Sequence, residues 1–399
     1  MIAKLTQFIR RWLRILLVLL LIAIVAGVYL FWRSTIPPAP SAFYTPPDVL
    51  PQGAPGTIIR SEPITENVPE GAVAWRILYL TTGLDGEPVA VSGTVAAPAG
   101  ESAAPRPVIA FAQGTIGILP ECGLSHRARP FGGIPQIDLM IQQGYVVAAT
   151  DYPGLGTPGI HPYLVAPIEA HSVLDSVRAA RQMPVSAGEE FVVWGRSQGG
   201  HSSLWTAILA SDYAPELTLI AAAATAPAID LEGILRFGET RRAGAILTAM
   251  AIYAWNTVYD EVDLDTLIRP EMREKFEQVA RTCISNPAAF LLLGDIPTPQ
   301  EFLALDLLTT EPYRSLIAES TPNGAISVPL LLTHGTGDVI IPFEGSVEAA
   351  AQRCERGEDV TLIRLPGVAH DAAPEAAVMT IGWFDDRFAG LPTGSTCPR

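Results

Sequence analysis

The sequence of 399 residues predicts an α/β fold with a mostly parallel, doubly wound sheet. Three observations lead to this prediction. Short apolar runs of strand length alternate with helical patterns over the first half of the chain, which is the order of a parallel sheet with helices on both faces. A glycine-rich turn from strand to helix follows at Gly195–Gly199, and two more strand-like runs occur after a long helical stretch.

The expected elements follow one another regularly up to about residue 226. The predicted strands are Trp75–Leu80, Val89–Val95, Val108–Ala112, Tyr145–Thr150, Phe191–Trp194 and Leu219–Ala224, and the predicted helices are Ile134–Gln143 and Ile168–Arg181. Gly144 closes the first helix, because glycine readily adopts the backbone conformation that ends a helix. We expect residues 57–226 to form the first part of the sheet domain.

Helical and irregular sequence interrupts this order at residues 227–324. This stretch contains the uncharged run Ala243–Trp255, the amphipathic segment Arg269–Ala280 and the apolar run Phe290–Leu293. Strand patterns return at Val328–Leu332 and Val360–Leu365, and a last helix is expected at Glu375–Phe388. The simplest interpretation is a helical cap inserted between two strands of one sheet, with residues 325–399 completing the domain.

The N-terminal residues differ from the rest of the chain in charge and hydrophobicity. A basic head at residues 1–14 precedes residues 15–32, which carry no charge and have the length of a short membrane-spanning helix. A cleaved signal peptide has the same order of parts, but its apolar region is usually only about 7–15 residues long. An uncleaved anchor is therefore the favoured prediction, and a cleaved signal is the alternative. Residues 33–56 are rich in proline and predict an extended stalk.

Both alternatives export the rest of the chain to the periplasm or the cell exterior. The basic residues lie mostly before the span, so the N-terminus should stay in the cytoplasm. The part after residue 33 holds 21 basic and 41 acidic residues, a net charge of −20. A surface with this charge repels phosphate backbones, which argues against nucleic acid as a partner.

Four cysteines lie on the exported side of the span: Cys122, Cys283, Cys354 and Cys397. An even number in an oxidising compartment predicts two disulfide bonds. The sequence contains no Cys-x-x-Cys motif and no cluster of cysteine and histidine, so no metal site is expected.

The turn at Gly195–Gly199 has the pattern Gly-x-Ser-x-Gly, with Ser197 at its centre. The pattern alone is common. Its position after the strand Phe191–Trp194 and before a helix that runs on from Ser202 is typical of the turn that carries a nucleophilic serine. Glycines allow strand and helix to pack closely there. A serine at the helix N-terminus is also placed where backbone N–H groups favour a developing negative charge. Ser197 is therefore the candidate nucleophile, and a structural turn is the alternative.

A serine nucleophile needs a histidine base, and the base needs a carboxylate that orients it. In folds with this turn the order along the chain is serine, acid, histidine. Asp338 lies in the loop after the strand Val328–Leu332, and His370 lies in the loop after Val360–Leu365. Since both follow strands of the same sheet, we expect Ser197, Asp338 and His370 to meet at one rim.

Other histidines and acids are weaker candidates. His334 is expected to shape the loop of the acid, His201 is expected to pack or to cap, and His171 is expected to lie on a helix flank. Asp371, beside the expected base, is expected to be solvated.

Several motifs together resemble the secretory lipase family of α/β-hydrolases, which includes the fungal lipase A type. They are Gln113-Gly114-Thr115 with Cys122 after it, Thr150–Thr157 with His161-Pro162-Tyr163, the turn Gly195–Gly200, and the loops of Asp338 and His370. The resemblance implies a catalytic triad of Ser197, Asp338 and His370. It implies an oxyanion hole from the amide of Gln198 and from Gln113 or Gly114, and the disulfides Cys122–Cys283 and Cys354–Cys397.

The expected activity is hydrolysis of carboxylic esters, with short to medium acyl chains, through an acyl-enzyme intermediate. No metal or organic cofactor is implied. The expected partners are a small-molecule or lipid ester substrate and a membrane that holds the N-terminal helix. Two alternatives remain open: an acyltransferase with the same triad, and a membrane-tethered binding protein of this fold without turnover.

Overall fold

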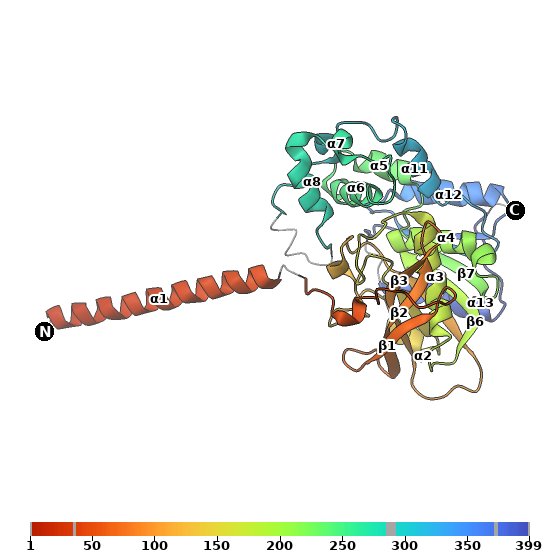
Figure 1. Cartoon of the computed structure of the whole chain (residues 1–399), viewed down its shortest axis with the longest axis horizontal. Coiled ribbons are helices and arrows are strands. Elements are labelled where there is room, and N and C mark those ends of the chain that lie inside the picture. Colours follow the sequence, from red (N-terminus) through yellow and green to blue (C-terminus); the bar gives the residue numbers. More distant parts are fainter. Residues whose placement is uncertain (1, 35–36, 285–292, 371–373, 398–399) are drawn as a thin grey trace.

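The computed structural model describes residues 2–34, 37–284, 293–370 and 374–397 (Figure 1). The first of these ranges is almost entirely one helix, α1 (Ile2–Ser34), which Figure 1 shows extending away from the rest of the molecule. The remaining ranges fold around a single sheet. Most of the expected run Phe290–Leu293 lies outside the described residues.

The sheet has nine strands within the described ranges, in the order β1-β2-β3-β5-β4-β6-β7-β8-β9. The strands are β1 (Ile58–Ile64), β2 (Ala72–Thr82), β3 (Pro88–Pro98), β4 (Arg106–Ala112), β5 (Val146–Thr150), β6 (Ala187–Arg196), β7 (Thr218–Thr225), β8 (Leu330–Gly335) and β9 (Val360–Leu365). The pairs that involve β1, β2 and β3 are antiparallel, and every pair from β5 to β9 is parallel. The predicted mostly parallel sheet is therefore confirmed.

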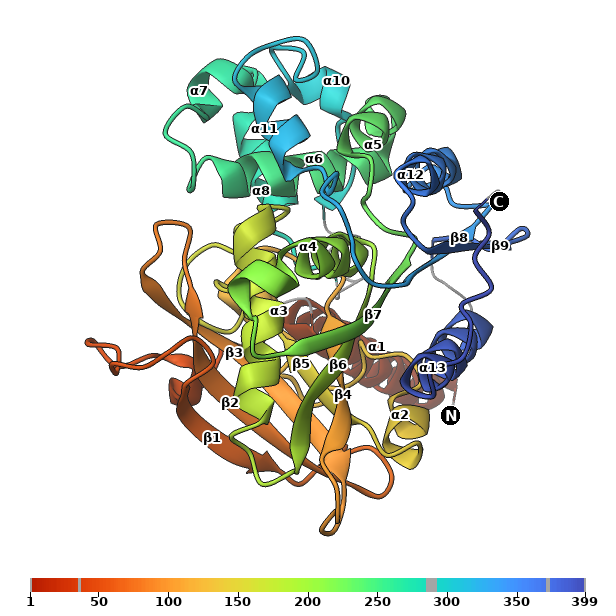
Figure 2. The same cartoon turned by 90° about the vertical axis from the view of Figure 1, so that its right-hand side faces the viewer.

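Helices cover both faces of the sheet (Figure 2). The side chains of α3 (Ala166–Ala180), α4 (Gln198–Tyr213) and α12 (Phe343–Glu355) join one apolar core, and those of α2 (Ile137–Gln142) and α13 (Pro374–Phe388) join the other. Successive residues of β4 alternate between the two cores, with Ala110 in the first and Phe111 in the second. This alternation is the two-residue period of a strand buried on both faces.

The described part of the chain between β7 and β8 is mainly helical. It contains α5 (Leu231–Gly238), α6 (Arg242–Trp255), α7 (Leu264–Leu267), α8 (Arg273–Ala280), α10 (Pro299–Phe302) and α11 (Tyr313–Ser320). Figure 2 shows these helices grouped beyond one end of the sheet, above α3 and α4. We call this group the cap.

The structure differs from the sequence expectations in three places. Strand β1 and helix α12 were not predicted. The segment expected as one helix at Arg269–Ala280 is a short 3₁₀ turn at Pro270–Met272 followed by α8. Each expected strand is present, with its ends shifted by a few residues.

Helix α4 starts unusually close to the ends of β4 and β6. A Cβ atom on Gly199, in the first turn of α4, would lie 2.0 Å from the carbonyl oxygen of Ala112 at the end of β4. A Cβ atom on Gly195, near the end of β6, would lie 2.2 Å from the carbonyl oxygen of Gly199. Both positions therefore require glycine, because any side chain would push the helix off the strands.

The alanine variant of Gly199 tests this close packing. Gly199→Ala should lower the free energy of unfolding by at least about 1–3 kcal/mol, the usual cost of overpacking. Gly382 is the matched control, since it lies in α13 with nothing within 4 Å of an added Cβ. Gly382→Ala should raise the free energy of unfolding by about 0.5–1 kcal/mol. Chemical denaturation measures both changes, and a Gly199→Ala protein as stable as the wild type would contradict the packing.

Candidate active site

Ser197 connects β6 to α4 in a strained backbone conformation, with φ of 59° and ψ of −118°. Its amide donates to the carbonyl of Thr225 at 2.9 Å, and its carbonyl accepts from the amide of Ala228 at 3.2 Å. Both partners lie at or just after the end of β7, the neighbouring strand. These two bonds hold a conformation that a non-glycine residue adopts only where its surroundings fix it.

The structure brings Ser197, His370 and Asp338 into one hydrogen-bonded row. His370 Nε2 lies 3.0 Å from Ser197 Oγ, and His370 Nδ1 lies 2.8 Å from Asp338 Oδ2. A carboxylate only accepts, so the Nδ1–H of His370 donates to Asp338. The neutral ring then has a free lone pair on Nε2, which accepts the hydroxyl proton of Ser197.

Asp338 is held as an anion by its own loop. Its Oδ1 accepts from the amides of Ile340 at 2.8 Å and Ile341 at 2.9 Å. Its Oδ2 accepts from His334 Nε2 at 3.1 Å as well as from His370. Burial alone would raise the pKa of Asp338, but hydrogen bonds from His334, His370 and the backbone hold that pKa below its ordinary value.

His334 acts on the acid and not on the serine. Its ring is fully buried, and its Nδ1 accepts from the hydroxyl of Ser346 at 2.7 Å while its Nε2 donates to Asp338. His334 therefore orients Asp338, which is the role expected from the sequence.

The expected oxyanion donors lie beside Ser197. Gln198 is the first residue of α4, and the first N–H groups of a helix have no partner within it. Gln113 and Gly114 follow β4, and a Cβ atom on Gly114 would lie 3.0 Å from the carbonyl oxygen of Arg196. The loop after β4 therefore passes directly against the turn that carries Ser197.

Two disulfide bonds are present, Cys122–Cys283 and Cys354–Cys397, which are the pairs that the family resemblance implies. The first joins the loop after β4 to the chain after α8. The amide of Ile284 also donates to the carbonyl of Ile116 at 3.0 Å, next to this bridge. Within the ranges that the structure describes, no three side chains of His, Cys, Asp or Glu gather into a metal-sized site.

An apolar cavity of about 50 Å³ opens on Ser197 and runs into the cap. Its other lining residues are Tyr163, Leu164, Ala228, Leu231, Ile234, Leu235, Gly244, Leu247, Thr248, Ala251, Trp255, Ile317 and Ile341. A second cavity of about 20 Å³ continues it deeper into the cap, and the two share Leu235, Thr248, Ala251, Trp255 and Ile317.

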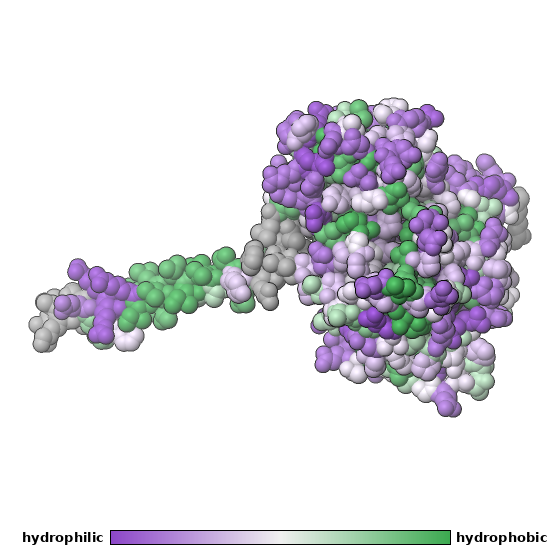
Figure 3. All heavy atoms as spheres, viewed as in Figure 1, coloured by the Kyte–Doolittle hydropathy of each residue, from purple (hydrophilic) through white to green (hydrophobic). Residues whose placement is uncertain are grey.

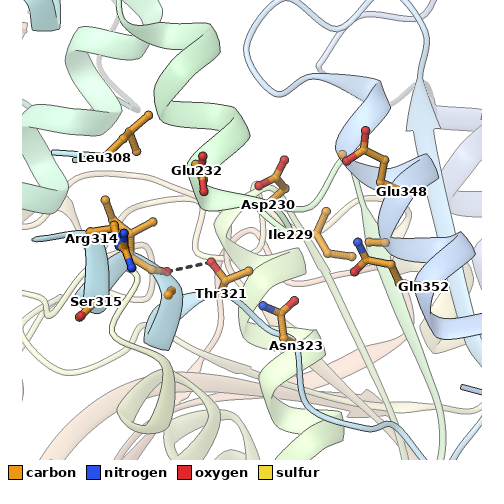
Figure 4. Close-up of a pocket in the computed structure, with 14 residues that line it drawn as sticks. Ile229, Asp230, Glu232, Leu308, Arg314, Ser315, Thr321, Asn323, Glu348 and Gln352 are labelled. Carbon is orange, nitrogen blue, oxygen red and sulfur yellow. Dashed lines mark hydrogen bonds between the residues drawn. The ribbon is translucent and has the colours of Figure 1, made fainter. Parts of the chain in front are cut away.

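A larger cleft of about 560 Å³ lies between α5, α11 and α12 (Figure 4). Its labelled side chains are mostly polar, among them Asp230, Arg314 and Glu348, and Ser197 does not line it. A polar cleft does not suit an acyl chain. The apolar cavity on Ser197 is the better match for a hydrocarbon group.

A buried polar cluster behind Ser197 was missed by the sequence reasoning. Glu169 of α3 is fully buried and contacts Gln198, His201 and Ser202 of α4. His201 was expected to pack, and Glu169 was not considered. The available signal was an acid with apolar neighbours inside a helix whose pattern predicts burial.

Comparisons with known proteins identify the family of the chain. A family model described as secretory lipase matches residues 135–396. A secreted triacylglycerol lipase of Malassezia globosa is 26% identical over 418 residues, 96% of this chain and 89% of that protein. A Mycobacterium tuberculosis protein named probable inactive lipase is 26% identical over 379 residues, covering 89% of this chain and 83% of that one.

Solved structures show the same fold. Candida antarctica lipase A superposes with a TM-score of 0.76 at 19% identity, over 90% of this chain and 87% of that one. The rice cell wall degrading esterase LipA from Xanthomonas oryzae superposes with a TM-score of 0.70 at 21% identity, over 85% of this chain and 100% of that one. Both likenesses establish an α/β-hydrolase fold. Since the family model covers more than half of the chain, the protein belongs to the secretory lipase family of serine ester hydrolases.

Proposed function

We propose that the protein hydrolyses carboxylic esters through an acyl-enzyme intermediate on Ser197. The observation that carries the proposal is the row of hydrogen bonds from Ser197 Oγ to His370 Nε2 at 3.0 Å and from His370 Nδ1 to Asp338 Oδ2 at 2.8 Å. His370 takes the hydroxyl proton as Ser197 Oγ attacks the ester carbonyl. Asp338 stabilises the imidazolium that forms and holds the ring in the required orientation.

The attack produces a tetrahedral intermediate with a negative oxygen. The amides of Gln198 and of Gln113 or Gly114 donate to this oxygen. His370 then gives its proton to the alkoxide leaving group, the carbon–oxygen bond breaks, and the alcohol departs. Water attacks the acyl-enzyme by the same route in reverse, with His370 as base, and releases the carboxylic acid and free Ser197.

One relative carries the name probable inactive lipase, so turnover is the property to test. Ser197→Ala should lower kcat/KM for a soluble ester by about 10⁴-fold or more, with the fold retained. His370→Ala and Asp338→Ala should also lower kcat/KM by orders of magnitude. The first removes the base of the serine, and the second removes the carboxylate that orients this base. His334→Ala should cost much less, since His334 does not contact Ser197.

Labelling with a fluorophosphonate separates the alternatives. Labelled wild type with turnover in water supports the hydrolase, and transfer of most acyl groups to an added alcohol would make the protein an acyltransferase. An unlabelled, folded wild type would mean a binding protein without turnover.

If His334→Ala abolished activity while His370→Ala did not, the assignment of the base would be wrong.

The apolar cavity beside Ser197 supports a preference for short to medium acyl chains. Its walls come from the cap and offer hydrocarbon contacts, and its small volume limits how much of a chain fits. Each buried methylene stabilises a bound acyl group by about 0.8 kcal/mol, or roughly a fourfold gain in kcat/KM. The strongly acidic chain should also make anionic esters poor substrates.

We predict that kcat/KM rises from acetate esters into the medium-chain range. Ala251 lines both apolar cavities, so Ala251→Phe should reduce medium-chain activity by at least tenfold and leave acetate activity nearly unchanged. A panel of p-nitrophenyl esters measures both effects. Flat or falling efficiency beyond acetate in the wild type would mean that the cap closes the cavity to longer chains.

The family is secretory, and we propose that α1 keeps this member on the membrane as an uncleaved anchor. The 22-residue segment Arg10–Phe31 contains an 18-residue window with a mean hydropathy of 2.8. Its uncharged part, residues 15–32, has a helical length of about 27 Å against a bilayer core of about 30 Å. Figure 3 shows apolar side chains along α1 next to a hydrophilic N-terminal end. Arg11 and Arg14 favour the cytoplasmic side for that end, which places the sheet domain outside.

Extraction of membranes tests the anchor. The full-length protein should stay in the pellet after an alkaline carbonate wash, and protease added to spheroplasts, from which the outer cell envelope has been removed, should reach the sheet domain. A mature protein whose first residue lies beyond α1, found free in the medium, would instead identify a cleaved signal. Protection from external protease would reverse the proposed orientation.

A further inference from the structure

The carboxylate of Glu169 is the centre of a buried polar cluster that the proposed reaction does not use. Its Oε1 accepts from Gln198 Nε2 at 2.7 Å and from the amide of Leu164 at 2.9 Å. Its Oε2 accepts from Ser202 Oγ at 2.5 Å and from His201 Nδ1 at 3.3 Å. Burial alone would raise the pKa of Glu169, but the hydrogen bond and charge of His201 hold that pKa below its ordinary value.

One chain of hydrogen bonds, which we call the first arm, connects Glu169 to Gln198, the residue next to the proposed nucleophile. The side-chain Nε2 of Gln198 donates to Glu169 and to His161 Nε2, each at 2.7 Å. His161 can accept there because its Nδ1–H donates to the carbonyl of Pro153 at 3.2 Å. Within the described part of the chain, Gln198 Oε1 is buried without a partner. The bonds of Nε2 therefore set the orientation of this side chain.

The second arm reaches the loop after β4. The hydroxyl of Ser202, which donates to Glu169, lies 3.0 Å from the hydroxyl of Tyr152. Because the Ser202 proton is used on Glu169, the one proton of the Tyr152 hydroxyl is shared between Ser202 Oγ and the carbonyl oxygen of Gln113, which lies 3.1 Å away. One carboxylate is therefore connected to both segments that carry the proposed oxyanion donors.

The cluster also joins the first turn of α4 to the cap. His201 faces Glu169 with one nitrogen and the carbonyl of Ser320, the last residue of α11, with the other at 2.8 Å. Both of these partners are acceptors, so the ring lies between the carboxylate of α3 and the last carbonyl of α11. Trp205, one turn further along α4, donates to the same carbonyl at 3.0 Å.

Three strained residues lie on this cluster or beside it. Tyr152, Leu164 and Ser197 have positive φ values of 71°, 57° and 59°. Leu164 donates its amide to Glu169, and Tyr152 donates its hydroxyl at the end of the second arm. Residues with positive φ persist where the surroundings fix them, and they concentrate at functional sites.

We propose that Glu169 is a positioning residue for ester hydrolysis. It holds Gln198 and, through Ser202 and Tyr152, the carbonyl of Gln113, and so fixes the two segments whose backbone amides face the oxyanion. The inference rests on the proposed function, because it takes its reaction and its oxyanion donors from there. An oxyanion donor held in place stabilises the negative oxygen of the transition state and contributes little to binding of the ester itself. Loss of Glu169 should therefore lower kcat and leave KM nearly unchanged.

Two variants and one control test the proposal. Glu169→Gln keeps the size of the side chain and removes its charge, and Gln198→Met removes the hydrogen bonds of the first arm and leaves the backbone N–H in place. Asp175→Asn is the control, because Asp175 is also a buried carboxylate of α3 but bonds to Thr81, Arg178 and Tyr213, away from α4's first turn.

Both test variants should show a kcat reduced about 10–100-fold, with KM within threefold of the wild type. This is less than the loss of one whole oxyanion donor, which lowers kcat by about 10²–10³-fold. Their affinity for a trifluoromethyl ketone, whose bound hemiketal carries an oxyanion, should fall by the same factor. Asp175→Asn should change the melting temperature and keep kcat within threefold.

A kcat of wild-type size in either folded test variant, or a loss seen only in KM or in the melting temperature, would overturn the role of Glu169. If Glu169→Gln does not fold, Gln198→Met decides by the same criteria. Failure of the proposed function is distinguishable, since the wild type itself would then show neither turnover nor fluorophosphonate labelling of Ser197.

Discussion

The close approach of α4 to the ends of β4 and β6 is the constraint on which the rest of the site depends. Gly195 and Gly199 allow this approach, because any Cβ atom there would overlap backbone oxygens. The approach forces the connecting residue, Ser197, into a positive φ, and its side chain lines the apolar cavity at the end of the sheet. It also sets the first amide of α4 beside the loop after β4. The positions of the proposed nucleophile and of the proposed oxyanion donors thus both follow from one packing contact.

The parallel sheet supplies the other half of the arrangement. The loops after β8 and β9 leave the same edge as the turn after β6, so residues more than a hundred positions apart meet at one rim. Asp338 is fixed there by two amides of its own loop and by His334, which leaves one direction open for the bond with His370. The cap then closes over this rim with apolar side chains, as an acyl-binding site requires.

Much of this could be predicted from the sequence because the main signals are local. Buried parallel strands appear as short apolar runs, and Ser197, Asp338 and His370 each follow such a run directly. Strand β1 was missed because most of its residues are partly exposed and it contains Pro63, which weakens the strand pattern. Helix α12 was missed because its sequence, FEGSVEAAAQRCE, holds few large apolar residues.

The cluster around Glu169 could not be predicted for a different reason. His161, Glu169, His201 and Ser320 come from four separate segments, and no spacing in the sequence connects them. Their hydrogen bonds exist only once α3, α4 and α11 have packed. The sequence shows which residue types are present, but not that a buried carboxylate will face the helix that begins at Gln198.

The central claim is that Ser197 and the amides beside it form one preorganised site for an acyl-transfer transition state. A crystal structure of the protein inactivated with an alkyl phosphonate tests this most directly, because the phosphorus mimics the tetrahedral carbon. We expect phosphorus bonded to Ser197 Oγ, the phosphoryl oxygen about 2.7–3.1 Å from the amide of Gln198 and from that of Gln113 or Gly114, and the alkyl chain in the apolar cavity. A phosphoryl oxygen that points to solvent, or phosphorus bonded to another residue, would contradict it.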